Sequence, residues 1–282
     1  MTTFGNLSLA SELETAIELA RAAGAIIMNH YAQGTEVEIK GDDSPVTVAD
    51  KDANELIVKG LREAFPDDAI LAEESTDDLA RQGSRRLWCV DPLDGTREFI
   101  DKNGMFVVMI GLAIDGEAKA GVVYQPTEDL LMWGADGMSG VVHNGENIQH
   151  GVTACSTPQD ASMVVSRSHR SSTVTAVAER LGVKNEKPLG SVGLKVAYIV
   201  MGKAEMYLST SDRMMEWDTC APEAILRASG GTVTDIRGEP LRYNKTKPNT
   251  HFGVLATNGP LHRPAVLALD PVCQERQWNI TG

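Results

Sequence analysis

The stretch Trp88–Phe99, with the sequence WCVDPLDGTREF, indicates an apolar strand that delivers two carboxylates into a Gly-Thr turn. Asp91 and Asp94 are hard oxygen ligands of the kind that suits Mg²⁺. If a helix begins at this turn, the amides of Gly95 and Thr96 direct hydrogen-bond donors and the positive end of a helix dipole toward an anion. The stretch therefore predicts a metal and phosphate site at the end of a strand.

Two further acidic clusters strengthen this interpretation, because D-P-x-D-G alone is a common turn sequence. One cluster, around Glu73, lies upstream, and the other, around Asp218, lies downstream. A strand that ends in Glu73 can lie beside one that ends in Asp91, so that both carboxylates meet at one sheet edge. Clustered carboxylates raise their own pKa values unless cations offset the repulsion, so we expect about two or three Mg²⁺ ions here.

Thr96 and Asp50 form the candidate pair for handling a water molecule. A threonine hydroxyl bonded to a carboxylate can orient water for attack on a phosphate. Bound Mg²⁺ would lower the pKa of that water, clamp the phosphate oxygens and neutralise the leaving alkoxide. This arrangement predicts phosphoryl-transfer chemistry.

The composition is that of an ordinary globular protein. The 282 residues are 42% hydrophobic and 23% charged. A net charge of −13 argues against nucleic-acid polymers and anionic membranes as partners, but it permits a small phosphorylated substrate on bound Mg²⁺. With no secretory signal and no apolar run long enough to span a bilayer, we expect a cytoplasmic protein without an integral membrane segment. The cysteines are scattered and are expected to be reduced and mostly buried.

Hydrophobic periodicity predicts an N-terminal α+β domain over residues 1–150. One helix is expected over Leu13–Tyr31, ending at Gly34, and a second after Thr47, whose side chain forms a capping box with Asp50. Strands are expected at residues 70–72, 87–90, 106–114, 121–124 and 130–133, with hairpin turns at 115–116, 136–137 and 144–145. We therefore expect two helices on a mostly antiparallel sheet that carries most of the metal ligands.

Residues 151–282 are predicted to form a second, α/β domain, although no linker marks the boundary. Strands are expected at 163–166, 205–208, 232–236 and 253–256, and helices at 173–181, 192–201 and 219–229. Asp218 precedes the last of these helices as a cap or first-turn residue.

The three acidic motifs, in this order, resemble the magnesium-dependent, lithium-sensitive phosphatases, a superfamily of inositol monophosphatase, fructose-1,6-bisphosphatase and the 3'(2'),5'-bisphosphate nucleotidases. The resemblance runs from about residue 10 to residue 257. It implies the layered αβαβα sandwich of that superfamily, of the α+β or α/β class. It also implies a division of roles, with metal ligands at Glu73, Asp91, Asp94, Asp218 and the Leu93 carbonyl, water activation by Asp50 and Thr96, and phosphate binding at Gly95 and Thr96.

Details of the motifs favour the nucleotidase branch. Leu93 and Arg97-Glu98-Phe99 resemble the nucleotidase form, whereas inositol monophosphatases tend to read D-P-I-D-G-T-x-N-F. The resemblance implies removal of the 3'-phosphate of adenosine 3',5'-bisphosphate (PAP), with its sulfated relative PAPS as a further candidate, giving AMP and phosphate. Such an activity would fit sulfur metabolism, as disposal of a by-product of sulfate assimilation. The implied nucleotide contacts are Ser166, His169, Ser191 and Lys195, of which Lys195 would meet the uncleaved phosphate.

Three alternatives remain open. The substrate could be an inositol monophosphate, an inositol bisphosphate cleaved at its 1-phosphate, or fructose 1,6-bisphosphate. A covalent phosphatase of the haloacid dehalogenase type uses a similar D-x-D-G-T motif, but the extra residue here would turn one carboxylate to the opposite face of an extended strand. A non-enzymatic cation-binding module is disfavoured because the Ca²⁺-loop pattern is absent. Both a monomer and a homodimer are compatible with the sequence.

Overall fold

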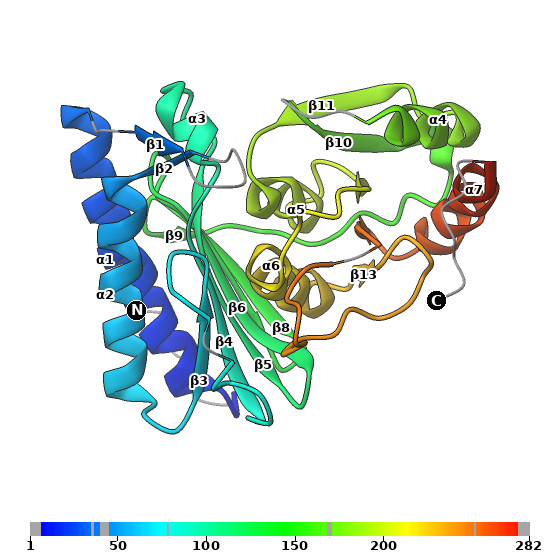
Figure 1. Ribbon diagram of the computed structural model, residues 1–282. Coiled ribbons are helices and arrows are strands. Elements are labelled where there is room, and N and C mark those ends of the chain that lie inside the picture. The colour runs from blue at the N-terminus through cyan, green and yellow to red at the C-terminus, as the bar shows by residue number, and fades with distance from the viewer. Residues whose placement is uncertain are drawn as a thin grey trace.

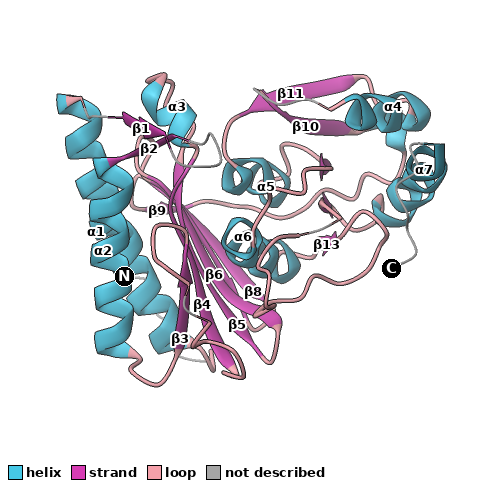
Figure 2. Cartoon of the chain, in the orientation of Figure 1, coloured by secondary structure: helices cyan, strands magenta, loops and turns pink. Residues whose placement is uncertain are grey.

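Five layers of secondary structure, in the order αβαβα, make up the described part of the chain (Figure 1, Figure 2). The computed structural model describes residues 7–34, 37–39, 45–77, 79–167, 171–250 and 252–275. Two helices cover one face of a seven-stranded sheet, and two more lie between that sheet and a five-stranded one. Another two helices cover the outer face of the second sheet. The expected αβαβα sandwich is therefore confirmed.

The helices of the first outer layer are α1 (Ala10–Gln33) and α2 (Val48–Ala64). As predicted, Gly34 follows the end of α1, and α2 begins at a capping box. Asp50 Oδ2 accepts hydrogen bonds from Thr47 N at 2.8 Å and from Thr47 Oγ1 at 2.7 Å. Within the described ranges, no helix combines the length and the apolar character that crossing a membrane requires.

The seven-stranded sheet connects each strand to its neighbour in the chain, in the order β3-β4-β5-β6-β7-β8-β9. Its strands are β3 (Ala69–Ala72), β4 (Arg86–Asp94), β5 (Val107–Ile114), β6 (Glu117–Gln125), β7 (Leu130–Ala135), β8 (Met138–His143) and β9 (Glu146–Asn147). β3 and β4 are parallel and the other neighbours antiparallel, as expected. The predicted turns have positive φ at both central residues, which type I′ hairpin turns require. The prediction did not include β8 and β9, which follow the last two turns.

The five-stranded sheet has the order β11-β10-β12-β14-β13. Its strands are β10 (Ser162–Ser166), β11 (Asn185–Leu189), β12 (Met206–Ser209), β13 (Thr232–Thr234) and β14 (Val254–Thr257), and the helices around it are α4 (Ser172–Leu181), α5 (Val192–Val200), α6 (Glu216–Ala228) and α7 (His262–Glu275). The short elements are β1 (Val37–Ile39), β2 (Pro45–Thr47), α3 (Thr96–Ile100) and the 3₁₀ helix η1 (Pro158–Asp160). The expected alternation of helices and strands after residue 151 is confirmed.

Two elements of this second part were missed for physical reasons. β11 is an edge strand whose sequence, Asn-Glu-Lys-Pro-Leu, consists mostly of residue types that are uncommon in strands. α7 contains Pro271, and a proline interrupts the helical pattern that sequence reasoning follows. β13 also ends two residues earlier than expected, because Asp235 Oδ1 accepts hydrogen bonds from Arg237 N at 2.8 Å and Glu239 N at 3.0 Å in a turn.

The chain leaves the first sheet after β9 and enters the second at β10, and the expected boundary at residue 151 lies between these two strands. The two parts share a hydrophobic core, because α6 of the second part packs against β5 and β6 of the first. That residues 1–150 and 151–282 are separate domains stays a prediction.

The thiols of Cys89, Cys155 and Cys220 are free, and those of Cys89 and Cys220 are buried. The expectation of unpaired cysteines is confirmed for these three. The side chain of Cys273 lies outside the described residues.

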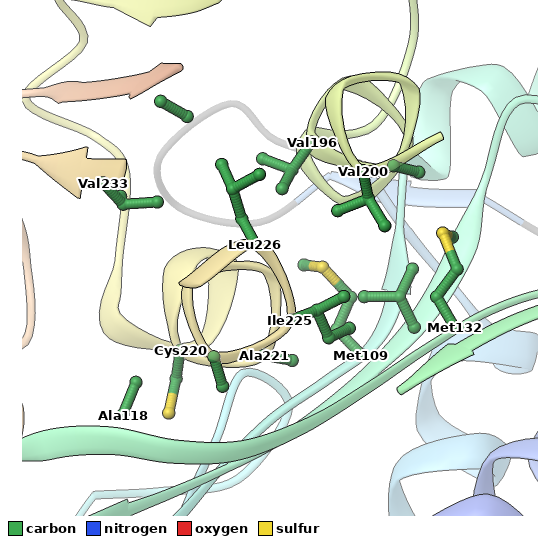
Figure 3. Close-up of a cluster of buried hydrophobic side chains, with 14 of the residues drawn as sticks. Met109, Ala118, Met132, Val196, Val200, Cys220, Ala221, Ile225, Leu226 and Val233 are labelled. Carbon is green, nitrogen blue, oxygen red and sulfur yellow. The ribbon is translucent and has the colours of Figure 1, made fainter. Parts of the chain in front are cut away.

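A row of glycines lets α6 lie close against the seven-stranded sheet. Gly111, Gly121 and Gly134 are directly paired across β5, β6 and β7. A Cβ atom on Gly121 would lie 2.4 Å from the Ala221 carbonyl oxygen, and one on Gly111 would lie 2.6 Å from Ala221 N. Figure 3 shows Ala221 on the side of α6 that faces the sheet. Because α6 carries Asp218 in its first turn, the glycine row sets how closely that carboxylate approaches the sheet.

Gly121→Ala is expected to lower the free energy of unfolding by about 2–3 kcal/mol, because the added methyl group would overlap the backbone of α6. Strand propensity alone predicts the opposite sign, since alanine is favoured over glycine inside a strand by about 0.5–1 kcal/mol. Urea unfolding measures the difference. Lys119→Ala, at an exposed position on the same strand, is the control and should change stability by less than about 1 kcal/mol. A Gly121→Ala protein as stable as the wild type would contradict this close packing.

Candidate active site

The ends of β3 and β4 bring Glu73 and Asp91 to one edge of the sheet. The two strands are parallel, with Ala72 opposite Val90. Glu73 N donates a hydrogen bond to the Val90 carbonyl oxygen at 3.0 Å, which continues the pairing past the end of β3. The predicted side-by-side placement of these two strand ends is confirmed. Asp91 is only 2% exposed, and its burial, together with the charges of neighbouring carboxylates, raises its pKa well above the ordinary value.

A β-bulge places Asp94 near Asp91. Asp91 lies opposite Met109 and Asp94 opposite Val107, so the segment of β4 between the two acids holds one residue more than the facing segment of β5. Residues three apart in a regular strand point to opposite faces, and the extra residue of a bulge reverses that relation. The charge of Asp94 accordingly contributes to the raised pKa of Asp91. Compared with a D-x-D motif, one more residue lies between Asp91 and Asp94, and it was expected to turn the two carboxylates to opposite faces of the strand. That expectation is wrong, because β4 has a bulge at this point.

Asp218 approaches the same edge from the first turn of α6. Met215 N donates to Asp218 Oδ2 at 2.7 Å, so the helix begins at Glu216, before the expected start at Thr219. Burial raises the pKa of Asp218 well above its ordinary value, and the charges of Asp94 and Glu73 add to the shift. The structure thus brings four predicted acids, from separate parts of the chain, close enough to repel one another.

The donor chemistry of this acidic cluster fits a hard divalent cation. In the part of the chain that the structure describes, no group of three or more His, Cys, Asp or Glu side chains is arranged to hold a metal ion as it stands. However, the pKa values of Asp91, Asp94 and Asp218 are all raised, mainly by burial. A cation among these carboxylates would offset both the burial and the mutual repulsion of their charges. Their role as metal ligands stays a prediction.

Thr96 and Asp50 are in direct contact, although they lie 46 residues apart in the chain. Thr96 Oγ1 donates to Asp50 Oδ1 at 3.1 Å and also lies 3.3 Å from the Leu93 carbonyl oxygen. Asp50 is 1% exposed, and the capping box at Thr47 holds its other oxygen. A helix does begin at this turn, with Gly95 at a φ of 104° before α3. α3 is only five residues long, so the backbone amides matter here more than any helix dipole.

A cavity of about 210 Å³ opens beside these residues. Its lining includes predicted site residues from both parts of the chain: Glu73, Asp94, Gly95, Thr96, Ser166, Ser191 and Lys195. Asp50 does not line the cavity but contacts Thr96, which does. Asp91, Leu93 and Asp218 are likewise not part of the lining. His169 lies outside the described residues, so its predicted nucleotide contact is not placed.

Lys195 brings a buried cation to the cavity. It lies on α5, is 4% exposed, and donates from Nζ to the Ser191 carbonyl oxygen at 3.0 Å. Nζ also lies 5.3 Å from the ring centroid of Tyr207. Burial lowers the pKa of Lys195, and the neighbouring carboxylates, above all Asp94, oppose that shift. The lysine charge therefore partly balances the acidic cluster.

Several lining residues were not predicted as site residues. Glu98, on α3, is 6% exposed and lies against Gly190, where a Cβ atom would come within 2.2 Å of Glu98 Cγ. Arg167 Nε lies 3.4 Å from Glu98 Oε1. The sequence gives no sign that Glu98 belongs to the site, because a glutamate in a helix is usually solvated. Gly193 N, which donates to Asp94 Oδ2 at 2.8 Å, could not be foreseen, since a backbone donor has no residue-type signal.

A family model described as "Inositol monophosphatase family" matches residues 8–269. A 3'(2'),5'-bisphosphate nucleotidase CysQ of Salmonella typhimurium is 39% identical over 234 residues, which cover 82% of this chain and 93% of the relative. A fructose-1,6-bisphosphatase/inositol-1-monophosphatase of Thermotoga maritima is 31% identical over 269 residues, with 93% and 97% covered. The solved structure of CysQ from Bacteroides thetaiotaomicron has a TM-score of 0.74 at 32% identity, with 90% and 99% covered. Inositol monophosphatase from Anabaena has a TM-score of 0.77 at 30% identity, with 93% and 96% covered.

Proposed function

The chain belongs to the inositol monophosphatase family, and within this family of phosphatases we propose that it is a magnesium-dependent 3'(2'),5'-bisphosphate nucleotidase. The reaction would remove the 3'-phosphate of PAP and release AMP and phosphate. The choice of substrate is supported by the CysQ nucleotidases, which are 38–39% identical to this chain over about four fifths of its length. PAPS, which carries the same 3'-phosphate, is a further candidate.

The proposal of direct attack by water rests on the contact between Thr96 and Asp50 beside the acidic cluster. Mg²⁺ held by Glu73, Asp91, Asp94, Asp218 and the Leu93 carbonyl would lower the pKa of a bound water and offset the charge on the phosphate oxygens. We propose about two or three such ions, the number that a multi-carboxylate site of this kind commonly holds.

Thr96 and Asp50 would move the proton of the attacking water. Because the Thr96 hydroxyl donates to Asp50 Oδ1, its oxygen lone pairs remain able to accept a hydrogen bond from water. As the water oxygen forms its bond to phosphorus, a water proton passes to Thr96 Oγ1, and the threonine proton passes to Asp50 Oδ1. The phosphorus bond to the 3'-oxygen breaks in the same displacement, and the leaving 3'-oxygen takes a proton from solvent water, which gives the 3'-hydroxyl of AMP. Asp50 then returns its proton to solvent. The capping box keeps Asp50 directed at Thr96 throughout, since it holds the other carboxylate oxygen.

The rest of the cavity would hold the substrate. The backbone amides of Gly95 and Thr96 would bind the phosphate that is cleaved. Lys195 Nζ, one of whose three hydrogens is donated to Ser191, would attract the phosphate that is not cleaved. Ser166, at the end of β10, would contact the nucleotide from the second part of the chain. His169 is proposed as a further nucleotide contact on the basis of the resemblance alone.

A substrate panel tests this proposal. The purified protein is assayed with Mg²⁺ for phosphate release from PAP, PAPS, inositol 1-phosphate, inositol 1,4-bisphosphate and fructose 1,6-bisphosphate. We expect kcat/KM for PAP to exceed that for inositol 1-phosphate by about 10²-fold, since polar groups placed for one substrate are left unpaired by another. Chromatography should identify AMP as the product, and chelation of Mg²⁺ or addition of Li⁺ should suppress turnover.

Other outcomes separate the two parts of the proposal. A clear preference for inositol 1-phosphate or fructose 1,6-bisphosphate, the substrates named for the Thermotoga maritima relative, would overturn the proposed substrate and leave the mechanism. Turnover of PAP that is unaffected by chelation would overturn the mechanism.

A further inference from the structure

Ser191 has a backbone conformation that serine rarely adopts. Its φ of 54° and ψ of 136° place it in a region that favours glycine. A side chain persists there only where the surrounding structure holds it, at a cost in local strain. Ser191 is 5% exposed and precedes the first residue of α5. Its side chain must therefore make contacts that a glycine could not.

The Ser191 hydroxyl joins α5 to the acidic cluster. Oγ donates to Asp94 Oδ2 at 2.6 Å and accepts a hydrogen bond from Leu194 N at 3.1 Å. Gly193 N donates to the same Asp94 oxygen at 2.8 Å. Two donors at the start of α5 thus hold one oxygen of a carboxylate that lies about a hundred positions earlier in the chain, at the bulge of β4.

While it is bonded to Asp94, the Ser191 hydroxyl cannot donate a hydrogen bond to a phosphate. A serine hydroxyl has one hydrogen, and here that hydrogen is engaged by Asp94. The oxygens of an ionised phosphate only accept hydrogen bonds. A direct contact between Ser191 and the substrate would therefore require the bond to Asp94 to break.

We propose that Ser191 is a positioning residue for Asp94 and not a nucleotide contact. By holding Oδ2, Ser191 and Gly193 determine how Asp94 presents its other oxygen to the cavity. Partners of this kind tune metal-binding carboxylates, and their loss typically lowers metal affinity or activity by about 10–100-fold. The inference rests on the proposed function, in which Asp94 is a metal ligand, and it changes the role that the family resemblance implies for Ser191.

Ser191→Ala and Ser191→Gly test this proposal together, because they remove the same hydroxyl but differ in backbone strain. Isothermal titration calorimetry measures Mg²⁺ binding to each purified protein, with no substrate present. Steady-state kinetics measure kcat, the Mg²⁺ concentration for half-maximal rate, and KM for PAP at saturating Mg²⁺. Thermal unfolding in the absence of Mg²⁺ compares the stabilities of the two variants.

Both variants are expected to bind Mg²⁺ about tenfold or more weakly and to need correspondingly more Mg²⁺ for turnover. KM for PAP at saturating Mg²⁺ should stay within about twofold of the wild type, because no substrate contact is lost. Ser191→Gly should melt roughly 3 °C or more above Ser191→Ala, since glycine relieves the positive φ. Lower stability combined with unchanged Mg²⁺ binding would mark Ser191 as a structural cap only and overturn the proposal.

Ser171→Ala is the matched control. Ser171 is the residue before α4, and its Oγ accepts a hydrogen bond from Val174 N at 3.2 Å, so this serine also caps a helix. Its φ is an ordinary −81°, and its hydroxyl contacts Thr210 instead of an acid of the cluster. The variant should lose some stability and bind Mg²⁺ as the wild type does. A similar loss of Mg²⁺ binding in Ser171→Ala would overturn the specific link between Ser191 and Asp94.

The outcomes also separate this inference from the proposed function. Ser191 variants that bind Mg²⁺ normally but show a raised KM for PAP would overturn the positioning role, while the nucleotidase proposal would stand. A wild-type protein that prefers another phosphate ester would overturn the substrate alone, since Mg²⁺ calorimetry needs no substrate. A wild-type protein that binds no Mg²⁺ would overturn both.

Discussion

Asp94→Asn is expected to lower kcat/KM for PAP by about 10³-fold or more at saturating Mg²⁺, because it removes a charge from the centre of the acidic cluster. Asparagine has the shape of aspartate and can still accept hydrogen bonds from Ser191 Oγ and Gly193 N through its carbonyl oxygen. The loss should therefore reflect the missing charge and not a collapsed site. Steady-state assays of the purified variant measure it.

The same variant should fold at least as stably as the wild type in the absence of Mg²⁺. Burial raises the pKa of Asp94 in the folded chain, so its ionised form lowers stability as the pH rises through the folded-state pKa. A neutral asparagine removes that penalty. The melting temperature of the variant minus that of the wild type should therefore increase as the pH is raised. Thermal unfolding at several pH values measures this difference.

Asp115→Asn is the control for this prediction. Asp115 lies in the turn after β5, at the opposite end of the β4–β5 pair from Asp94, and its backbone φ of 52° suits asparagine. We expect that variant to keep full activity. An Asp94→Asn protein that retained the wild-type rate would remove Asp94 from the reaction and with it the proposed metal site.

Thr96→Val is expected to lower kcat by about 10²–10³-fold with little change in KM for PAP, because it removes the hydroxyl proposed to relay the proton of the attacking water. Valine is close to threonine in shape, so the start of α3 should be preserved. Asp50 Oδ1 would lose the hydrogen bond that it accepts at 3.1 Å. Initial rates at saturating PAP and Mg²⁺ measure the effect.

Thr96→Ser is the matched variant for this experiment. Serine keeps the hydroxyl and loses only a methyl group, so activity should stay within about tenfold of the wild type. Equal losses in the serine and valine variants would point to packing of the methyl group. A valine variant as active as the wild type would exclude a role for Thr96 in moving the proton.

Much of the fold could be predicted where the signal lies within a few residues. The capping box of Thr47 and Asp50 and the three two-residue hairpin turns have the predicted form. Each depends on hydrogen bonds or dihedral preferences of neighbouring residues, which persist in any tertiary context. The parallel strand ends at Glu73 and Asp91 were also foreseen, since two apolar runs ended in acids. In contrast, β11 and α7 were missed because their local preferences oppose the structure that packing imposes.

The sequence by itself determined the chemical identity of the candidate site: acids at element ends, a Gly-Thr turn and a lysine, in the order typical of one phosphatase family. Only the tertiary structure decided how these groups are oriented. The bulge that brings Asp94 near Asp91 depends on pairing with β5, the approach of Asp218 depends on a glycine row across three strands, and Ser191 contacts Asp94 across 97 residues. The reason is physical: residue types determine which atoms can donate, accept or carry charge, whereas register and close packing are collective properties of strands and helices that meet only after folding. The stretch Trp88–Phe99 thus identifies the chemistry, and its neighbours in space determine which oxygen of each acid is available for it.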